Sequence, residues 1–171
     1  DNFDGNANLY IGIFTVLAVG LYLLNQQIKI SDKIKKILLV GFFYLSFDEM
    51  ILNFIWHGFH DQYGIPNRFS FLFGFVLLHM LWEVFEHLDG TKGWHVAFAC
   101  MAGVGLLAYA RVKGTQPLED KVYGVAGMLF ILYGMILLLY TLSRKRKVWY
   151  KAAFCAVAII EIAATACMGF N

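Results

Sequence analysis

The sequence predicts an all-α protein, a polytopic transmembrane bundle of about six helices. Of its 171 residues 60% are hydrophobic and only 15% are charged, whereas average soluble domains are about 45–50% apolar and about 25% charged. The apolar residues gather into six runs, and none shows the short alternating pattern of a membrane β-strand. Because backbone groups inside a bilayer must bond to one another, such runs are expected to be helices.

The six runs differ in how directly they satisfy the length of a membrane span, which is about 20 residues. The first run and the last three satisfy it as they stand, and the second and third do so only by admitting polar residues. We expect one transmembrane helical domain, residues 1–171, that is a segment of a longer membrane protein. In chain order the runs are Asn8–Leu24, Ile34–Phe47 with an extension to Trp56, Phe69–Trp82, Trp94–Ala110, Val122–Leu142 and Val148–Met168.

Basic residues predict the orientation of these spans. The net charge of +2 is too small to indicate a nucleic-acid partner. Lys and Arg are concentrated in the connections after the first, third and fifth runs, which are therefore expected to face the cytoplasm. The connection at residues 57–68 is then extracytoplasmic. The first group contains Lys29, Lys33, Lys35, Lys36, Lys92, Arg144, Lys145, Arg146, Lys147 and Lys151, and the opposite group contains Arg68, Arg111, Lys113 and Lys121.

Acidic residues inside the runs are the next candidates for function, because charges are expensive in a membrane. At a rise of about 1.5 Å per residue, Asp48, Glu49 and Glu161 lie about 20 Å from the inner boundary. This depth suits a polar cavity open to the outside. An interfacial position for Asp48 and Glu49, followed by an amphipathic turn, fits equally well, and Glu161 is as well explained by pairing within the bundle.

Two further patterns are expected to be structural. His79 and Glu83 are neighbours on one helix face, but two ligands without a third are weak evidence for a metal, so we interpret them as a hydrogen-bonded pair between helices. The pairs Ala99/Gly103 and Ala152/Ala156 have the small-xxx-small spacing of closely packed helices. The three cysteines lie in apolar runs without metal-ligand spacing, and we interpret them as packing residues.

The loop between the second and third runs is the richest segment chemically. Glycines and Pro66 shape it, and Pro66-Asn67 signals the start of the next helix. The positive end of that helix, together with Arg68, His57 and His60, forms a natural site for a phosphate or another anion. An arginine reaching lipid headgroups explains the same residues equally well.

At this loop the chain resembles the YfhO family of bacterial multi-pass membrane proteins. The resemblance rests on the stretch from Leu52 to His60, on the stretch from Pro66 to Phe75 and, more weakly, on Asn8-Leu9-Tyr10-Ile11-Gly12. Gly74 and Ile65 depart from the residues usual in the family. Proteins of the family are several times longer, and their catalytic acid is expected upstream of Asp1.

The resemblance implies a glycosyltransferase of the GT-C type in the bacterial plasma membrane. It would move a sugar from a polyprenyl-phosphate carrier in the membrane to a cell-envelope polymer. Arg68, His57, His60 and Asn67 would then bind the carrier phosphate, and Asp48 or Glu49 are weak candidates for a catalytic base. No metal ligands are identified, and a requirement for a divalent ion stays open.

A second hypothesis is a transporter or flippase for a lipid-linked or small anionic substrate. Glu161, His79 and Glu83 would then form part of an ion or proton path. This hypothesis predicts polar residues through both halves of the bilayer and usually an internal repeat. The sequence shows no repeat and places most costly residues in the outer half. A non-catalytic scaffold is a third hypothesis.

Overall fold

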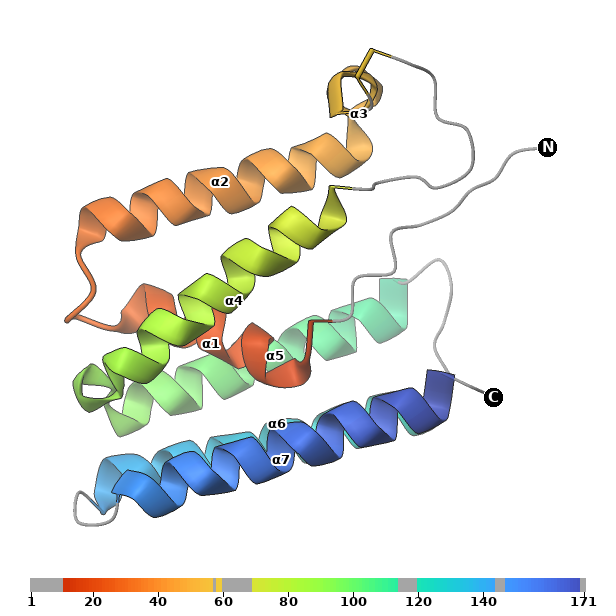
Figure 1. The fold of residues 1–171 in the computed structure, drawn as a ribbon. Coiled ribbons are helices and arrows are strands. Elements are labelled where there is room, and N and C mark those ends of the chain that lie inside the picture. The colour runs from red at the N-terminus through yellow and green to blue at the C-terminus, as the bar shows by residue number, and fades with distance from the viewer. Residues whose placement is uncertain (1–10, 57, 60–68, 114–119, 144–146, 170–171) are drawn as a thin grey trace.

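The computed structural model describes residues 11–56, 58–59, 69–113, 120–143 and 147–169. The described residues form a bundle of helices without strands, as the sequence predicts (Figure 1). The elements are α1 (Ile13–Leu24), α2 (Ile30–Asp48), α3 (Met50–Trp56), α4 (Ser70–Glu86), the 3-10 turn η1 (Leu88–Gly90), α5 (Gly93–Lys113), α6 (Asp120–Leu142) and α7 (Lys147–Gly169).

The long helices run up and down along one common direction, so the bundle has two ends (Figure 1). At the end that we call the basic end, α1, α4 and α6 finish and α2, α5 and α7 begin. At the opposite end α2 finishes and α4 begins. We call it the motif end because it holds the described residues on both sides of loop 57–68. The starts of α2 and α7, which carry the two densest groups of basic residues, thus lie together at the basic end, as the positive-inside pattern predicts.

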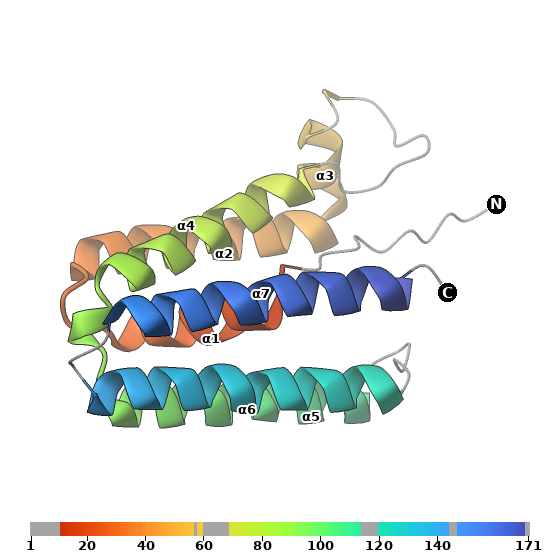
Figure 2. The same cartoon turned by 60° about the horizontal axis from the view of Figure 1, so that its bottom comes forward.

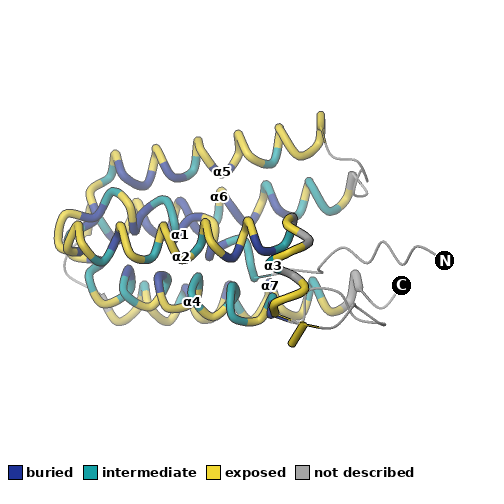
Figure 3. The backbone as a smooth tube through the Cα atoms, turned by 90° about the horizontal axis from the view of Figure 1, so that it is seen from above, coloured by how far each residue is buried: buried dark blue, intermediate teal, exposed yellow. Residues whose placement is uncertain are grey.

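Within the described part of the chain, three helices are long and apolar enough to cross a membrane, namely Gly93–Lys113, Lys121–Leu142 and Val148–Ala166. Outward-facing residues on these helices are largely apolar and exposed, as expected for surfaces that face lipid (Figure 3). With 19 and 17 residues, α2 and α4 are close to the length of a span, and both contain polar residues. Six spans therefore remain the prediction for the whole chain.

The first helix is shorter than its apolar run predicts. The described helix α1 has 12 residues and begins at Ile13, and residues 8–10 of the run lie outside the described part of the chain. Gly12 precedes it with φ +85°, a left-handed conformation that a helix cannot contain and that glycine adopts most easily. At about 18 Å, α1 is too short to cross the roughly 30 Å apolar core of a bilayer. Its start consequently lies partway along the bundle (Figure 1).

The core is organised around α1. This helix packs against α4, α5 and α6, and it is buried on most of its surface; Leu17, Ala18 and Tyr22 are fully enclosed. Seen from the side of α7, α1 lies behind that helix, with α4 above and α6 below (Figure 2). The rings of Phe14, Tyr133 and Phe154 are in contact there. The centroid of the Phe14 ring lies 4.9 Å from the centroid of each of the other two rings.

One of the two predicted small-xxx-small pairs packs closely against neighbouring helices. Ala99 and Gly103 are buried; Ala99 faces Gly20 of α1, and Gly103 packs directly against the Phe130 ring of α6. Gly20 is close enough that a Cβ built there would stand 3.1 Å from the Ala99 Cβ. The expectation for Ala152 and Ala156 is wrong, because both are exposed on α7. The motif gives the spacing of small residues, but it does not say whether a neighbouring helix is present.

Candidate functional site

The four residues of the predicted anion site, His57, His60, Asn67 and Arg68, fall outside the described part of the chain. The residues on either side are described. The helix α3 closes in a left-handed turn, with φ +67° at Gly58 and +63° at Phe59. The amide of Phe59 donates to the Phe54 carbonyl at 3.0 Å. The glycine that punctuates the loop in the sequence is thus a true helix terminator.

Aromatic stacking brings the two ends of the loop together. The rings of Trp56 and Phe69 stack with centroids 5.1 Å apart, and Phe47 stacks on the other flank of Phe69 at 5.1 Å. Trp56 immediately precedes His57 and Phe69 immediately follows Arg68. His57 and Arg68, two of the residues predicted to bind the phosphate, are therefore each adjacent in sequence to one of these two stacked rings.

The acidic pair beside this loop lies at a helix break. Asp48 is the last residue of α2, and Glu49 has extended backbone angles between α2 and α3. The Glu49 side chain is exposed. The short helix α3 then turns away from the axis of α2 (Figure 1). This arrangement matches the interfacial interpretation of the pair and does not by itself give Glu49 a catalytic contact.

A groove of about 790 Å³ runs from the motif end toward the middle of the bundle. That volume lies within the range of about 300–1,000 Å³ typical of small-molecule sites. One wall is α4, beginning at Ser70, and the other is α7; the start of α1 and Tyr133 form the floor. Mostly apolar side chains line it: Ile11, Gly12, Phe14, Thr15, Ser70, Phe71, Gly74, Phe75, Leu78, Leu81, Phe85, Tyr133, Phe154, Cys155, Ala158, Glu161 and Ile162.

Polar atoms in the groove gather where α1 begins. The Glu161 carboxylate accepts hydrogen bonds from the Ile13 amide at 2.5 Å and from the Tyr133 hydroxyl at 2.7 Å. The side chain of Thr15 bonds back to the Ile11 carbonyl at 2.7 Å. Glu161 is only 4% exposed. A helix start carries partial positive charge and free N–H groups, so it is a favourable place for a buried carboxylate.

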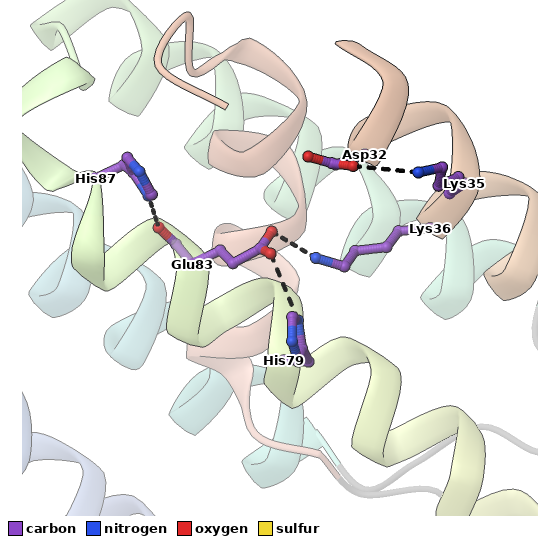
Figure 4. Close-up of polar contacts among 6 residues, drawn as sticks. All are labelled: Asp32, Lys35, Lys36, His79, Glu83 and His87. Carbon is purple, nitrogen blue, oxygen red and sulfur yellow. Dashed lines mark hydrogen bonds and ion pairs between the residues drawn. The ribbon is translucent and has the colours of Figure 1, made fainter. Parts of the chain in front are cut away.

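A second polar cluster lies near the basic end, between α2 and α4. Lys36 Nζ is 2.5 Å from Glu83 Oε2, and His79 Nδ1 is 3.8 Å from Glu83 Oε1 (Figure 4). Lys36 also lies over the Tyr22 ring, 5.2 Å from its centroid, and the Tyr22 hydroxyl adjoins the carboxylate. Lys36 thus joins His79 and Glu83 in a charged cluster at a distance from the motif end.

The sequence identified His79 and Glu83 as neighbours but missed the partner that balances their charge. Lys36 counted only as one of several basic loop residues, although it lies in the second turn of α2 and points across to α4 (Figure 4). Among the described residues, no three His, Cys, Asp or Glu side chains lie together as a metal site would require. The cluster is an ion pair between helices.

Polar contacts also close the basic end. Asn25 Nδ2 donates to the His87 carbonyl at 2.8 Å, and the Lys33 ammonium donates to the Leu23 carbonyl at 2.9 Å. The Tyr140 hydroxyl donates to Asp89 at 2.9 Å, joining α6 to η1. Asn25 and Lys33 thereby satisfy backbone carbonyls at the helix ends, and the Tyr140–Asp89 bond holds the connection after α4.

Comparison with known proteins decides the family. The family model described as bacterial membrane protein YfhO matches residues 1–171, the whole of the chain. The chain belongs to the YfhO family. No curated protein and no solved structure is similar enough to count as a match. For this YfhO-family chain, membership establishes a bacterial multi-pass membrane protein, and the apolar helices agree with it.

Proposed function

We propose that this chain is the membrane-embedded part of a glycosyltransferase that transfers a sugar from a polyprenyl-phosphate carrier to a cell-envelope polymer. The observation that carries the proposal is the continuity between groove and loop. The groove begins at Ser70, two residues after Arg68, and the loop that contains Arg68 is closed at its base by the Trp56–Phe69 stack. A lipid with an apolar chain and an anionic head requires such a pair of neighbouring sites.

In this proposal the isoprenoid chain of the carrier lies in the groove between α4 and α7. Apolar side chains such as Phe71, Phe75 and Leu78 offer it contact, and their burial would drive binding. The carrier phosphate binds at the motif end to Arg68, with His57, His60 and Asn67 as further donors. A guanidinium bonds phosphate oxygens in pairs, and it would stabilise the leaving phosphate during transfer.

The acceptor hydroxyl needs a base as it attacks the anomeric carbon. Asp48 and Glu49 remain weak candidates for that base because they lie beside the loop, although Glu49 is exposed. We propose instead that the main catalytic acid lies in a segment of the full-length protein outside these residues, as the family resemblance implies.

The proposed orientation has the basic end in the cytoplasm and loop 57–68 outside the bacterial plasma membrane. The charge of the connections supports it. Replacing Gly58 by Cys in intact cells provides the measurement. A membrane-impermeant thiol reagent added outside should label that residue without lysis, and labelling only after lysis would reverse the orientation.

The decisive experiment replaces Arg68 by Ala in the full-length protein, with envelope glycosylation as the readout. We expect transfer to fall by about 100-fold or more, since loss of one donor to developing charge typically lowers kcat by about 10²–10³. Arg111→Ala is the matched control, because it removes the same charge from α5 at the same end of the bundle. Unchanged transfer by Arg68→Ala at normal expression would remove the phosphate role.

One observation favours the alternative function of a transporter or flippase. Helices interrupted within the membrane often bind substrate with their positive ends, and α1 begins partway along the bundle. Charged clusters also occupy both halves, at Glu161 and at Glu83. Purified full-length protein in liposomes separates the two functions. Translocation of a polyprenyl-linked sugar without acceptor would favour the flippase, and transfer without translocation would favour the enzyme.

A further inference from the structure

The start of α1 is unstable in the groove unless its first backbone N–H groups find a hydrogen-bond acceptor. Its first N–H groups have no partner within the helix, and its preceding residue Gly12 is in a left-handed conformation. The surrounding side chains are mostly apolar, so water cannot freely satisfy these groups. A helix that begins inside a membrane bundle therefore needs a built-in acceptor.

Glu161 supplies that acceptor from a different helix. Its Oε1 accepts the Ile13 amide at 2.5 Å, while Oε2 accepts the Tyr133 hydroxyl at 2.7 Å. One side chain of α7 thus joins α1 and α6. In the sequence, Glu161 is 148 residues from Ile13 and 28 residues from Tyr133. A Cβ at position 12 would stand 3.4 Å from Oε1, in ordinary van der Waals contact, so the φ of +85° is what restricts this position to glycine.

The atoms that Glu161 fixes are also part of the groove. Gly12 and Phe14 form its floor, and Phe14 packs its ring on both Tyr133 and Phe154. A shift of the α1 start would move Phe14 and change the space between α4 and α7. The position of α1 is therefore coupled to the shape of the groove.

We infer that Glu161 is a positioning residue that sets the groove for the isoprenoid chain of the carrier. It does so by holding the broken start of α1 through Ile13, with Tyr133 orienting its carboxylate. The inference rests on the proposed function, because the chain in the groove belongs to that proposal. Glu161 acts on the carrier through the groove wall and takes no part in the chemical step.

The test uses a polyprenyl phosphate with a photoreactive group in its chain, added to the full-length protein in detergent. Labelling is mapped by mass spectrometry to peptides of α4 and α7, and its concentration dependence gives the half-saturation point. We expect Glu161→Ala to raise the half-saturation point by about tenfold, which corresponds to a loss of about 1.4 kcal/mol of binding free energy. Glu161→Gln keeps an oxygen acceptor for Ile13, so we expect a smaller rise.

The matched control is Glu83→Gln, which neutralises a carboxylate in the Lys36 cluster between α2 and α4. It should leave the half-saturation point unchanged even where it lowers the thermal stability. In transfer assays, Glu161 variants should raise KM for the carrier and leave kcat nearly unchanged. A purely structural role would instead lower the amount of active protein with KM constant in both variants.

Each remaining outcome has a definite consequence. If the photoprobe labels α4 and α7 but both Glu161 variants saturate like the native protein, the positioning role is wrong and the carrier site stands. Two results would show that the groove does not select the carrier chain: labelling outside α4 and α7, or competition by phosphatidic acid as strong as that by unlabelled polyprenyl phosphate. In either case the inference fails, together with the placement of the carrier chain in the proposed function. Loss of envelope transfer in Arg68→Ala with normal labelling would still support the phosphate site.

Discussion

The buried carboxylate of Glu161 and the partly buried carboxylate of Glu83 show two ways of keeping negative charge inside a helical bundle. Glu83 lies near the basic end and is balanced by a full positive charge, the Lys36 ammonium at 2.5 Å. Glu161 lies deeper, and the interactions described around it come from the Ile13 amide and the Tyr133 hydroxyl. An ion pair depends on one side-chain partner, whereas a helix start offers backbone N–H groups that every substitution except proline leaves in place.

The difference has a consequence for function. The Glu83 cluster joins two helices and lies apart from the groove, so we expect it to affect mainly stability. Glu161 borders the groove, so we expect it to affect binding as well. Four substitutions test this comparison, ordered from the largest expected change in the free energy of unfolding to the smallest.

Lys36→Met should have the largest effect. It leaves the Glu83 carboxylate without its ammonium partner, and breaking a buried pair costs about 3–5 kcal/mol. Because Lys36 and Glu83 side chains keep 16% and 22% of their exposure, the lower end, about 3 kcal/mol, is expected. Thermal unfolding in mild detergent measures it. The double variant Lys36→Met with Glu83→Gln should recover most of the loss, and equal losses for the single and double variants would argue against the pair.

Glu161→Ala should come second. It removes the acceptor of two hydrogen bonds, and bonds to charged groups contribute about 1.5–3 kcal/mol each, although the vacated space admits some relaxation. We expect a loss of about 2–3 kcal/mol in the same unfolding measurement. Hydrogen exchange should show faster exchange at the start of α1. Protection of those amides at the native level would mean that Glu161 does not cap the helix.

Gly12→Ala should have an intermediate effect on stability. A non-glycine residue at φ +85° costs about 1–2 kcal/mol, and the added Cβ approaches Glu161. Gly124→Ala is the matched control on α6, where no side chain lies within 4 Å of the added Cβ. Within a helix this change should stabilise by about 0.5–1 kcal/mol. The same sign for both variants would contradict the broken start of α1.

Tyr133→Phe should have the smallest effect. It removes one hydroxyl from the Glu161 carboxylate while the bond from Ile13 remains, so about 1 kcal/mol is expected. The ring contacts with Phe14 and Phe154 are preserved in Phe, which makes the variant a test of the hydroxyl alone. A loss as large as that of Glu161→Ala would show that Tyr133, and not the α1 start, is the main support of the carboxylate.

Part of the candidate site could be predicted from the sequence. The run of aromatics around the loop indicates an interfacial segment, and Gly58 does end a helix there. The role of Phe69 could not be predicted, because its stacking on Trp56 joins residues 13 positions apart in sequence through side-chain geometry. The groove was missed for the same reason, since its walls come from residues spread between Ile11 and Ile162.

The sequence by itself determined the class of this protein. Apolar runs of span length leave helices as the solution for a chain in lipid, and the spacing of Lys and Arg predicts which ends of the helices lie together. These are local or additive properties, readable from composition and length. The small-residue pattern at Ala99 and Gly103 was readable as well, whereas the same pattern at Ala152 and Ala156 misled.

Only the tertiary structure decided where α1 begins and which charges face each other. An apolar run that starts at Asn8 has the length of a span, yet the helix begins at Ile13 because Gly12 turns and a carboxylate 148 residues away accepts the first amide. Likewise, Lys36 is an ordinary basic residue until α2 lies against α4 and brings it to Glu83. Electrostatic and hydrogen-bond partners depend on distance in space, and sequence separation carries almost none of that information.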